Sequence, residues 1–307
     1  MNKISIVIPV YNSAKSIDSL SSQIHHQLND ISYEIIFIND NSNDDSWEKL
    51  KELSSSNKNT IALNLAKNFG QDCAIMAGLH HMTGDMVVIM DDDLQHDPSD
   101  ILNLKKKLTD NDHDVCYGRF VKKRQSFIKN IGSWLNDKVA NVVLKKPKEI
   151  YLSPFKILRK SLVERITKYD GPYPYIDGLI FRYTSAISSI DIEHHKRSIG
   201  KSNYSLQKSI SVWLRVLTNF SIIPLRLSTI IGIFSSFIGF SLALYFIVLH
   251  FLGVVEPEGW RSLIVSILFI GGVQLMALGV IGEYVGRAFL YQSKEPQFII
   301  KDIIKSN

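Results

Sequence analysis

Two long apolar stretches near the end of the chain constrain its fold more than any other feature. Residues 227–252 contain one side chain that titrates near neutral pH, His250, and residues 263–282 contain none. At about 1.5 Å per residue, a helix formed by either stretch can cross a hydrocarbon core of roughly 30 Å. Two helices buried in a soluble core are the alternative, but stretches this long and this free of charge favour a membrane. The sequence therefore predicts transmembrane helices at residues 227–252 and 263–286, joined by a loop at residues 253–262.

The distribution of charge indicates how this hairpin is oriented. Basic side chains flank it on both outer sides: Lys208, Arg215, Arg226, Arg287, Lys294, Lys301 and Lys305. The predicted loop between the helices holds two acidic residues and one arginine. Because positively charged flanks stay in the cytoplasm, we expect an integral protein of the inner (cytoplasmic) membrane with both termini cytoplasmic. The apolar run at the N-terminus is too short for a signal peptide and is broken by Pro9.

Composition narrows the choice of partners. The formal net charge of +5 suits phosphates and the headgroups of acidic membrane lipids. Nucleic acid is not an expected partner, because the sequence has no zinc-finger spacing, no RNA-binding aromatic signature and no Lys/Arg run longer than three. The two cysteines, Cys73 and Cys116, are too few for a disulfide framework and fit small core residues.

Strand-like and helix-like segments alternate along the first part of the chain. Apolar, β-branched runs occupy residues 4–10, 33–38, 60–65 and 85–90, with a weaker run at 114–118. Segments with helical spacing of apolar residues lie at 14–28, 44–53, 70–82 and 98–108. This alternation predicts an α/β fold with a doubly wound, mostly parallel sheet. Ligands of such sheets bind outside the carboxyl ends of the strands, so the residues that follow each strand are candidates for a site.

Three adjacent carboxylates follow the strand predicted at 85–90. Asp91, Asp92 and Asp93, in MDDDLQHD, would repel one another or raise one another's pKa values unless a cation lies among them. Mg²⁺ and Mn²⁺ prefer oxygen ligands and commonly bridge carboxylates to substrate phosphates. In an extended backbone Asp91, Asp93 and Gln95 point to the same side. The motif therefore indicates a divalent metal site, with a solvated acidic turn or a helix cap as the alternative.

Two other strand ends carry polar residues, and each taken alone is a weak signal. Asp40, in FINDNSNDDSW, follows the second predicted strand, and its carboxylate can accept a hydrogen bond from a nucleobase N–H. Clusters of Asn, Asp and Ser also mark ordinary loops. In IPVYN, Pro9 is expected to end the first strand and to leave Tyr11 and Asn12 at its tip.

The order of these motifs resembles family 2 glycosyltransferases with the GT-A fold. The likeness runs through IPVYN, INDNSNDDS, LAKNFGQDCAIMAGL and GDMVVIMDDDLQHDP. It is closer to the polyprenyl-phosphate branch, which includes dolichol-phosphate mannose synthase and bacterial undecaprenyl-phosphate glycosyltransferases, through LAKNFGQ, MDDDLQ, FSIIPLRL and IGEYVGR. The resemblance covers nearly the whole chain. It implies inverting transfer of a sugar from a nucleotide-sugar donor to a polyprenyl phosphate, for synthesis or modification of cell-surface glycans.

The resemblance also implies roles for particular residues. Asp91, Asp93 and Gln95 would hold Mg²⁺ or Mn²⁺, and Asp40 would contact the base of the donor. The other candidates for donor binding are Pro9, Tyr11, Asn12, Lys67 and Asp92. The candidates for binding the acceptor phosphate are Arg119 (in YGRF), Arg197 (in HHKRSIGKSNY), Lys201 and Ser202. The catalytic candidates are Asp93, Arg119, Arg197 and Asp177.

Two departures from the family pattern leave a catalytic base unassigned. Asn203 stands where the family usually has a lysine before Tyr204, and Lys201 is a possible substitute. Tyr151 stands where many relatives carry an aspartate that is discussed as a base. A phosphate monoester has a second pKa of about 6, so the acceptor is mostly dianionic at neutral pH and needs orientation more than deprotonation. Asp177 could act as a base or orienting group, or it could be a structural turn residue.

We expect the chain to be organised around this activity. A cytoplasmic GT-A catalytic domain is predicted at residues 1–210, with acceptor-side and juxtamembrane helices towards its end. A juxtamembrane segment at 211–226 precedes the two membrane helices. Residues 287–307 are predicted to form a cytoplasmic tail, through which a homo-oligomer could assemble.

Three other functions compete with this interpretation. A processive polysaccharide synthase would typically carry more membrane spans and a Gln-x-x-Arg-Trp motif, which the sequence lacks. A nucleotidyltransferase would be expected to show a glycine-rich, basic loop after the first strand, and IPVYNSAKS is not one. An inactive membrane scaffold that retains the fold is the third alternative, and the intact set of Asp91, Asp93 and Gln95 argues against it.

Overall fold

The computed structural model describes residues 3–110, 112–120, 150–192, 223–252 and 259–306. The candidate residues Arg197, Lys201 and Ser202 lie outside the described residues. The chain forms two compact units. One comprises Met1–Ser205 together with Lys294–Asn307, and the other comprises Leu206–Ser293.

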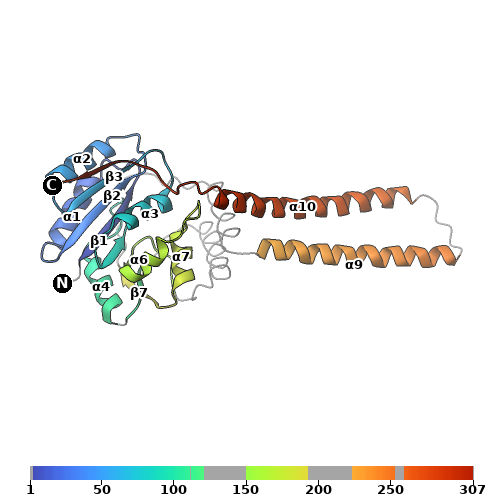
Figure 1. Ribbon diagram of the computed structural model, residues 1–307. Coiled ribbons are helices and arrows are strands. Elements are labelled where there is room, and N and C mark those ends of the chain that lie inside the picture. The colour runs from blue at the N-terminus through green and yellow to red at the C-terminus, as the bar shows by residue number, and fades with distance from the viewer. Residues whose placement is uncertain (1–2, 111, 121–149, 193–222, 253–258, 307) are drawn as a thin grey trace. The chain divides into compact units, whose positions relative to one another are not determined.

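The first unit is built on a mixed eight-stranded sheet (Figure 1). Its strands are β1 (Ile4–Val10), β2 (Tyr33–Asn39), β3 (Thr60–Leu65), β4 (Met86–Ile89), β5 (Val115–Phe120), β6 (Lys156–Arg159), β7 (Ile187–Ile192) and β8 (Ile300–Lys305). They are ordered β7-β5-β6-β4-β1-β2-β3-β8. The pairs β1–β2, β1–β4, β2–β3 and β5–β7 are parallel, whereas β6 is antiparallel to both neighbours and β8 is antiparallel to β3. This mostly parallel α/β sheet confirms the predicted fold class.

Helices cover both faces of the central strands, which explains why those strands are apolar along their whole length. The helices of this unit are α1 (Ile17–Gln27), α2 (Ser46–Ser56), α3 (Gln71–His81), α4 (Asp100–Asp110), α6 (Lys160–Ile166) and α7 (Ile176–Tyr183). Helices α1, α2 and α4 share one buried cluster with Ile4, Ile6 and Ile8 of β1. Helix α3 packs on the opposite face, against Val7 of β1 and Ile38 of β2.

The prediction that Pro9 ends the first strand is wrong, because Pro9 lies within β1. The pairing of β1 with β4 stops at Val7 and Ile89, before Pro9 is reached. The missing N–H of Pro9 therefore costs no ladder hydrogen bond with β4.

The end of the chain returns to the sheet. Residues 300–305, which the sequence places in a tail, form strand β8 and pair with β3 from Leu65–Ile300 to Ile61–Lys305. Ile304 packs against the buried cluster on one face of the sheet. Pairing with β8 also covers the edge of β3, whose backbone groups would otherwise be unpaired. The apolar, β-branched residues of this segment favour a strand, but no local pattern shows that its partner is β3, because the two segments are far apart in sequence.

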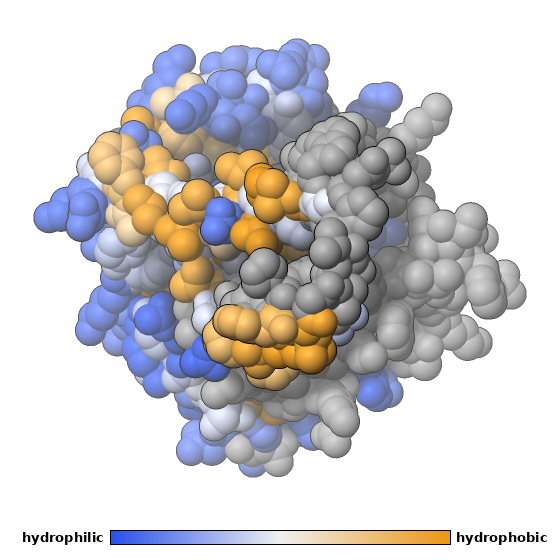
Figure 2. All heavy atoms as spheres, turned by 90° about the vertical axis from the view of Figure 1, so that its right-hand side faces the viewer, coloured by the Kyte–Doolittle hydropathy of each residue, from blue (hydrophilic) through white to orange (hydrophobic). Residues whose placement is uncertain are grey.

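Two long helices form the second unit. They are α9 (Ile223–Phe251) and α10 (Trp260–Gln292), which pack side by side and extend beyond the predicted spans (Figure 1). Apolar side chains on both are exposed, among them Phe240 at 70% and Leu275 at 72%, and Figure 2 shows apolar residues on the surface where this hairpin ends. Of the described helices, the part Phe269–Gln292 is long and apolar enough to cross a membrane, whereas the apolar part Leu225–Ser241 is shorter.

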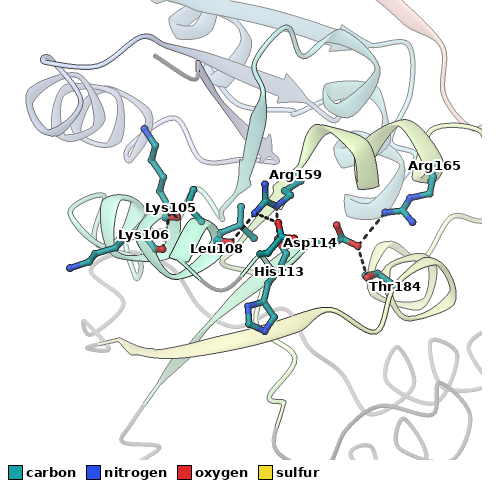
Figure 3. Close-up of polar contacts among 10 residues, drawn as sticks. Lys105, Lys106, Leu108, His113, Asp114, Arg159, Arg165 and Thr184 are labelled. Carbon is teal, nitrogen blue, oxygen red and sulfur yellow. Dashed lines mark hydrogen bonds and ion pairs between the residues drawn. The ribbon is translucent and has the colours of Figure 1, made fainter.

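An arginine joins α4, β5 and β6 at the end of the sheet opposite the carboxyl ends of the parallel strands (Figure 3). Arg159 donates from Nε to the carbonyl of His113 at 2.6 Å and from Nη2 to the carbonyl of Leu108 at 3.2 Å. Nearby, Arg165 contacts the carboxylate of Asp114 at 3.2 Å. Arg159 thus binds one carbonyl in the last turn of α4 and one in the segment that leads from α4 to β5.

Candidate active site

The ends of several strands meet along one edge of the sheet. The carboxyl ends of β1, β2, β3, β4, β5 and β7 lie there because these strands run in the same direction. Strand β6 runs the opposite way, so its first residue, Lys156, lies at this edge too. The sequence directs attention to this edge, where open α/β sheets bind their ligands.

The three consecutive aspartates leave β4 at this edge in an irregular loop. Asp91, Asp92 and Asp93 are all half-buried, and so is Gln95. Leu94 adopts a left-handed conformation with φ of 61°, which glycine, asparagine and aspartate adopt more easily than leucine does. The backbone N–H of Gln95 donates to Oδ1 of Asp93 at 3.1 Å. The loop therefore folds back on itself just after the aspartates.

Asp91 is held from two sides. Its Oδ1 accepts a hydrogen bond from Nε2 of Gln71, at the start of α3, at 2.8 Å. Its backbone N–H donates to Nδ1 of His96 at 3.4 Å, and the buried His96 ring stacks on Phe155 with centroids 5.0 Å apart. Gln71 and His96 were not predicted as site residues, although both lie inside the motifs that carry the family resemblance.

Asp92 contacts the neighbouring loop. Its Oδ2 accepts a hydrogen bond from the backbone N–H of Tyr11 at 3.4 Å, and its carboxylate also accepts one from the Ser13 side chain. Burial raises the pKa of Asp92 to about 6, and the charge of Asp93 acts in the same direction, while these hydrogen bonds oppose the shift. Asp92 thus links the loop after β4 to the loop after β1.

The loops after β1 and β2 are joined to each other. The backbone N–H of Asn12 donates to Oγ of Ser42 at 3.0 Å, and the backbone N–H of Asn43 donates to Oδ1 of Asn12 at 2.8 Å. Asn12 and Asn41 both have φ of 55°, a conformation that asparagine tolerates better than most residues. Tyr11 is 44% exposed and is the accessible aromatic ring of this loop pair.

Asp40 is buried at the end of β2 and organises a third loop. Its two carboxylate oxygens accept hydrogen bonds from the backbone N–H groups of Phe69 at 2.7 Å and Gly70 at 2.9 Å. Burial raises its pKa, while these two hydrogen bonds oppose the shift. Lys67 is exposed in the same loop, with Nζ 5.0 Å from the centre of the Phe69 ring. The contact of Asp40 with a donor base stays a prediction.

Arg119 lies near the end of β5 and is exposed. Its Nε and Nη2 donate to the two carboxylate oxygens of Asp191, on the adjacent strand β7, at 2.6 and 3.1 Å. This pairing raises the pKa of Arg119 and lowers that of Asp191. A guanidinium has five N–H groups, so the pair with Asp191 leaves donors for a phosphate.

Asp177 belongs to a buried polar cluster beneath the edge. Its Oδ1 accepts hydrogen bonds from the Tyr117 hydroxyl at 2.8 Å and from Nζ of Lys156, which is 3% exposed. Asp72, on α3, is close enough for its pKa to be raised to about 6, mainly by burial and further by the charge of Asp177. Asp177 is therefore bound by two donors, and its role as a base or orienting group stays a prediction. The lysine within the apolar run SPFKILR was the signal in the sequence that could have revealed this pair.

The side chains at this edge suit a divalent cation. Among the described residues, no group of three or more His, Cys, Asp or Glu side chains is arranged to hold a metal ion. Mg²⁺ needs no such group, because it commonly binds one or two carboxylates and takes its remaining ligands from substrate phosphates and water. The carboxylates of Asp91 and Asp93 and the amide of Gln95 are oxygen donors of the type that such an ion takes, and their role as its ligands stays a prediction.

Comparisons with known proteins agree with this arrangement. The model of the family described as "Glycosyl transferase family 2" matches residues 5–167. The chain is 30% identical to the prophage bactoprenol glucosyl transferase homolog of Escherichia coli K12, over 99% of this chain and 100% of that protein. It is 28% identical to the undecaprenyl-phosphate 4-deoxy-4-formamido-L-arabinose transferase of Photorhabdus laumondii, over 100% of this chain and 96% of that protein.

Solved structures share the fold of the first unit. Glucosyl-3-phosphoglycerate synthase from Mycobacterium tuberculosis, in complex with Mn²⁺, uridine diphosphate and phosphoglyceric acid, superimposes with a TM-score of 0.53. It is 18% identical, and the match covers 71% of this chain and 76% of that one. At this level of identity the match shows a shared fold.

Proposed function

The chain belongs to glycosyl transferase family 2, and from this premise we propose that it transfers a sugar from a nucleotide-sugar donor to a polyprenyl phosphate such as undecaprenyl phosphate. The observation that carries the proposal is the position of Asp91–Gln95 beside the loops after β1 and β2, in a chain that also contains two long apolar helices. The names of the relatives in Escherichia coli and Photorhabdus laumondii, which match nearly the whole chain, support the same acceptor class.

The donor would bind across the joined loops. Pro9, Tyr11 and Asn12 would line the nucleoside on one side, while Asp40 and Lys67 would lie on the other. Asp91, Asp93 and Gln95 would hold Mg²⁺ or Mn²⁺. Such an ion, when bound, neutralises charge on the diphosphate that leaves. Asp92 would hold the loop after β4 against the loop after β1 through its bond to Tyr11.

The acceptor phosphate would be the nucleophile. Its oxygen forms a bond to the anomeric carbon from the face opposite the diphosphate, whose bond to that carbon breaks, so the configuration is inverted. Arg119 would orient this phosphate with its remaining N–H groups, together with Arg197, Lys201 and Ser202. Because the phosphate is mostly dianionic at neutral pH, the reaction needs no strong base. Asp177, paired with Lys156, would then act in orientation rather than in proton removal.

The helices α9 and α10 would place this reaction at a membrane. Strand β8 follows α10 in the chain and pairs with β3, which precedes α9. The segments on both sides of the hairpin therefore belong to one folded unit and must lie on the same side of any membrane that the hairpin enters. This topology supports two crossings, and the basic flanking residues support a cytoplasmic catalytic unit.

The test is a transfer assay with the full-length protein in detergent. Undecaprenyl phosphate, Mg²⁺ or Mn²⁺ and a panel of radiolabelled nucleotide sugars are added, and label is measured in the organic phase. We expect label from one donor and its loss with EDTA. Release of nucleoside diphosphate without labelled lipid would point to another acceptor. Neither product from any donor would contradict the proposal and favour an inactive membrane scaffold.

A further inference from the structure

We propose that the C-terminal segment, residues 297–305, is a positioning element for the donor-binding loops. This inference rests on the proposed function, because it concerns the same loops. The segment lies after α10 in the chain, yet β8 pairs with β3 at the donor side of the sheet. Its contacts continue beyond this backbone pairing to the loop that follows β3, and hydrogen-bonded side chains connect it to the loop that follows β2.

Three hydrogen-bonded polar side chains lie next to one another on the neighbouring strands β8, β3 and β2. Nδ2 of Asn64 donates to Oδ2 of Asp302 at 3.0 Å, and Nδ2 of Asn39 donates to Oδ1 of Asn64 at 2.8 Å. The three residues are direct register partners on β8, β3 and β2. Asn39 is 2% exposed and Asn64 is 7% exposed, so each amide must find its partners within the protein.

This series of hydrogen bonds continues into the loop after β2. Oδ1 of Asn39 accepts a hydrogen bond from the backbone N–H of Ser42 at 3.2 Å. Oγ of the same serine accepts from the backbone N–H of Asn12 at 3.0 Å. The carboxylate of Asp302 is therefore connected, through two buried amides, to both loops that would hold the donor. Successive bonds in such a chain polarise and strengthen one another.

A second connection reaches the loop after β3. The carbonyl of Ile299 accepts a hydrogen bond from the backbone N–H of Ala66 at 2.9 Å, directly before Lys67. The same loop presents the Phe69 and Gly70 amides to the carboxylate of Asp40. Phe298 adds a ring contact with His80 of α3, with centroids 5.8 Å apart. The segment thus contacts the loop after β3 directly and is connected to the loop after β2 through Asn64 and Asn39.

Asp302→Ala in the full-length protein tests this role. We expect the backbone amides of Asn12, Ser42 and Asn43 to exchange with solvent deuterium roughly tenfold faster. We also expect binding of uridine diphosphate with Mn²⁺ to weaken about three- to tenfold, with binding of undecaprenyl phosphate unchanged. Lys301→Gln is the matched control, because Lys301 is an exposed neighbour on the same strand.

A reciprocal exchange separates positioning from a general loss of stability. Asn64→Asp alone places a second carboxylate against Asp302 and should accelerate exchange at the same loop amides. Adding Asp302→Asn restores a donor opposite an acceptor and should return exchange and nucleotide affinity towards the wild type. Faster exchange confined to β3 and β8, with unchanged loop amides and unchanged affinity, would overturn the inference. If the wild type binds neither uridine nor guanosine diphosphate, the proposed donor class is wrong, and the exchange measurement still decides this inference.

Discussion

Two adjacent aspartates at the end of β4 have different neighbours and therefore different expected tasks. Asp92 is bonded to the Tyr11–Ser13 loop, and burial raises its pKa to about 6. Asp93 accepts a local backbone bond from Gln95 and is half-buried at the edge of the sheet. Of the two, Asp93 is the one that we propose as a ligand of the cation.

The substitution Asp93→Asn should lower the transfer rate by roughly a hundredfold or more, since it removes a charged ligand from the proposed metal site. The amide oxygen of asparagine can still accept the bond from Gln95, so the loop should keep its fold. The exposed Asp110→Asn on α4 is the control and should match the wild type. Equal rates for Asp93→Asn and wild type, measured by label in the organic phase, would remove Asp93 from the mechanism.

Glu34 is a buried carboxylate at the opposite end of the sheet, where it contributes to stability. It accepts hydrogen bonds from Lys3 at 2.7 Å, Ser5 at 2.6 Å and the backbone N–H of Thr83 at 2.6 Å. Burial would raise the pKa of Glu34, but these bonds outweigh burial and hold the pKa below its usual value. Its stabilising contribution is therefore present above the pKa of the unfolded chain and is lost as the pH falls through the lowered folded pKa.

Glu34→Gln should lower the unfolding free energy at pH 7 by about 1–3 kcal/mol, because it replaces charged hydrogen bonds and leaves one donor unsatisfied. The difference from the wild type should shrink as the pH falls below about 4.5. Thermal unfolding of the full-length protein in detergent at several pH values measures both effects. The exposed Glu52→Gln serves as the control. A constant difference across this pH range would show that the ionised carboxylate is not the source.

At the scale of elements, α3 lies unusually close to the sheet. A Cβ atom at Gly78 would lie 2.5 Å from Cγ1 of Val7 and 2.8 Å from Cδ1 of Ile38. Only glycine allows this approach. The close packing matters for the site, because α3 begins with Gln71 and Asp72, which contact Asp91 and the backbone of Ile176.

Gly78→Ala should destabilise the protein by about 1–3 kcal/mol through overpacking, although alanine is the better helix former. Gly282→Ala in α10 is a matched control, because a Cβ there meets nothing within 4 Å. Thermal unfolding should show a lower midpoint for the first variant and an unchanged or higher midpoint for the second. An unchanged midpoint for Gly78→Ala would mean that α3 can move away from the sheet at little cost.

At the scale of the whole molecule, one chain leaves the sheet, forms two long apolar helices and returns to the same sheet. Because β8 shares the sheet with β1 to β7, the chain before α9 and the chain after α10 must lie in one compartment. The positive charges outside the hairpin then predict that this compartment is the cytoplasm.

Cysteine labelling in intact bacterial spheroplasts tests this topology. Glu256→Cys, in the predicted loop between the helices, should react with a membrane-impermeant maleimide, whereas Lys301→Cys should react only after lysis. Labelling of the two native cysteines should be low, because burial raises the pKa of Cys73 to about 12 and also raises the pKa of Cys116, so little of the reactive thiolate forms. Labelling of Lys301→Cys in intact spheroplasts would reverse the predicted orientation.

The sequence by itself determined the parts of this protein that depend on local pattern. Apolar β-branched runs predicted β1 to β5 to within a few residues, because strands buried on both faces need such residues. Acidic and turn-forming residues after those strands identified the edge that holds Asp40 and Asp91–Asp93. The long uncharged stretches predicted α9 and α10, since charge is costly in any apolar surrounding.

Only the tertiary structure decided which distant segments meet. It placed β6 between β4 and β5, paired Lys156 with Asp177 and bonded Arg119 to Asp191. It also joined β8 to β3 and connected Asp302 to the loop after β2 through Asn64 and Asn39. Such contacts depend on strand order and register, which are set by the packing of the whole sheet and carry no signal in the short-range spacing of residues.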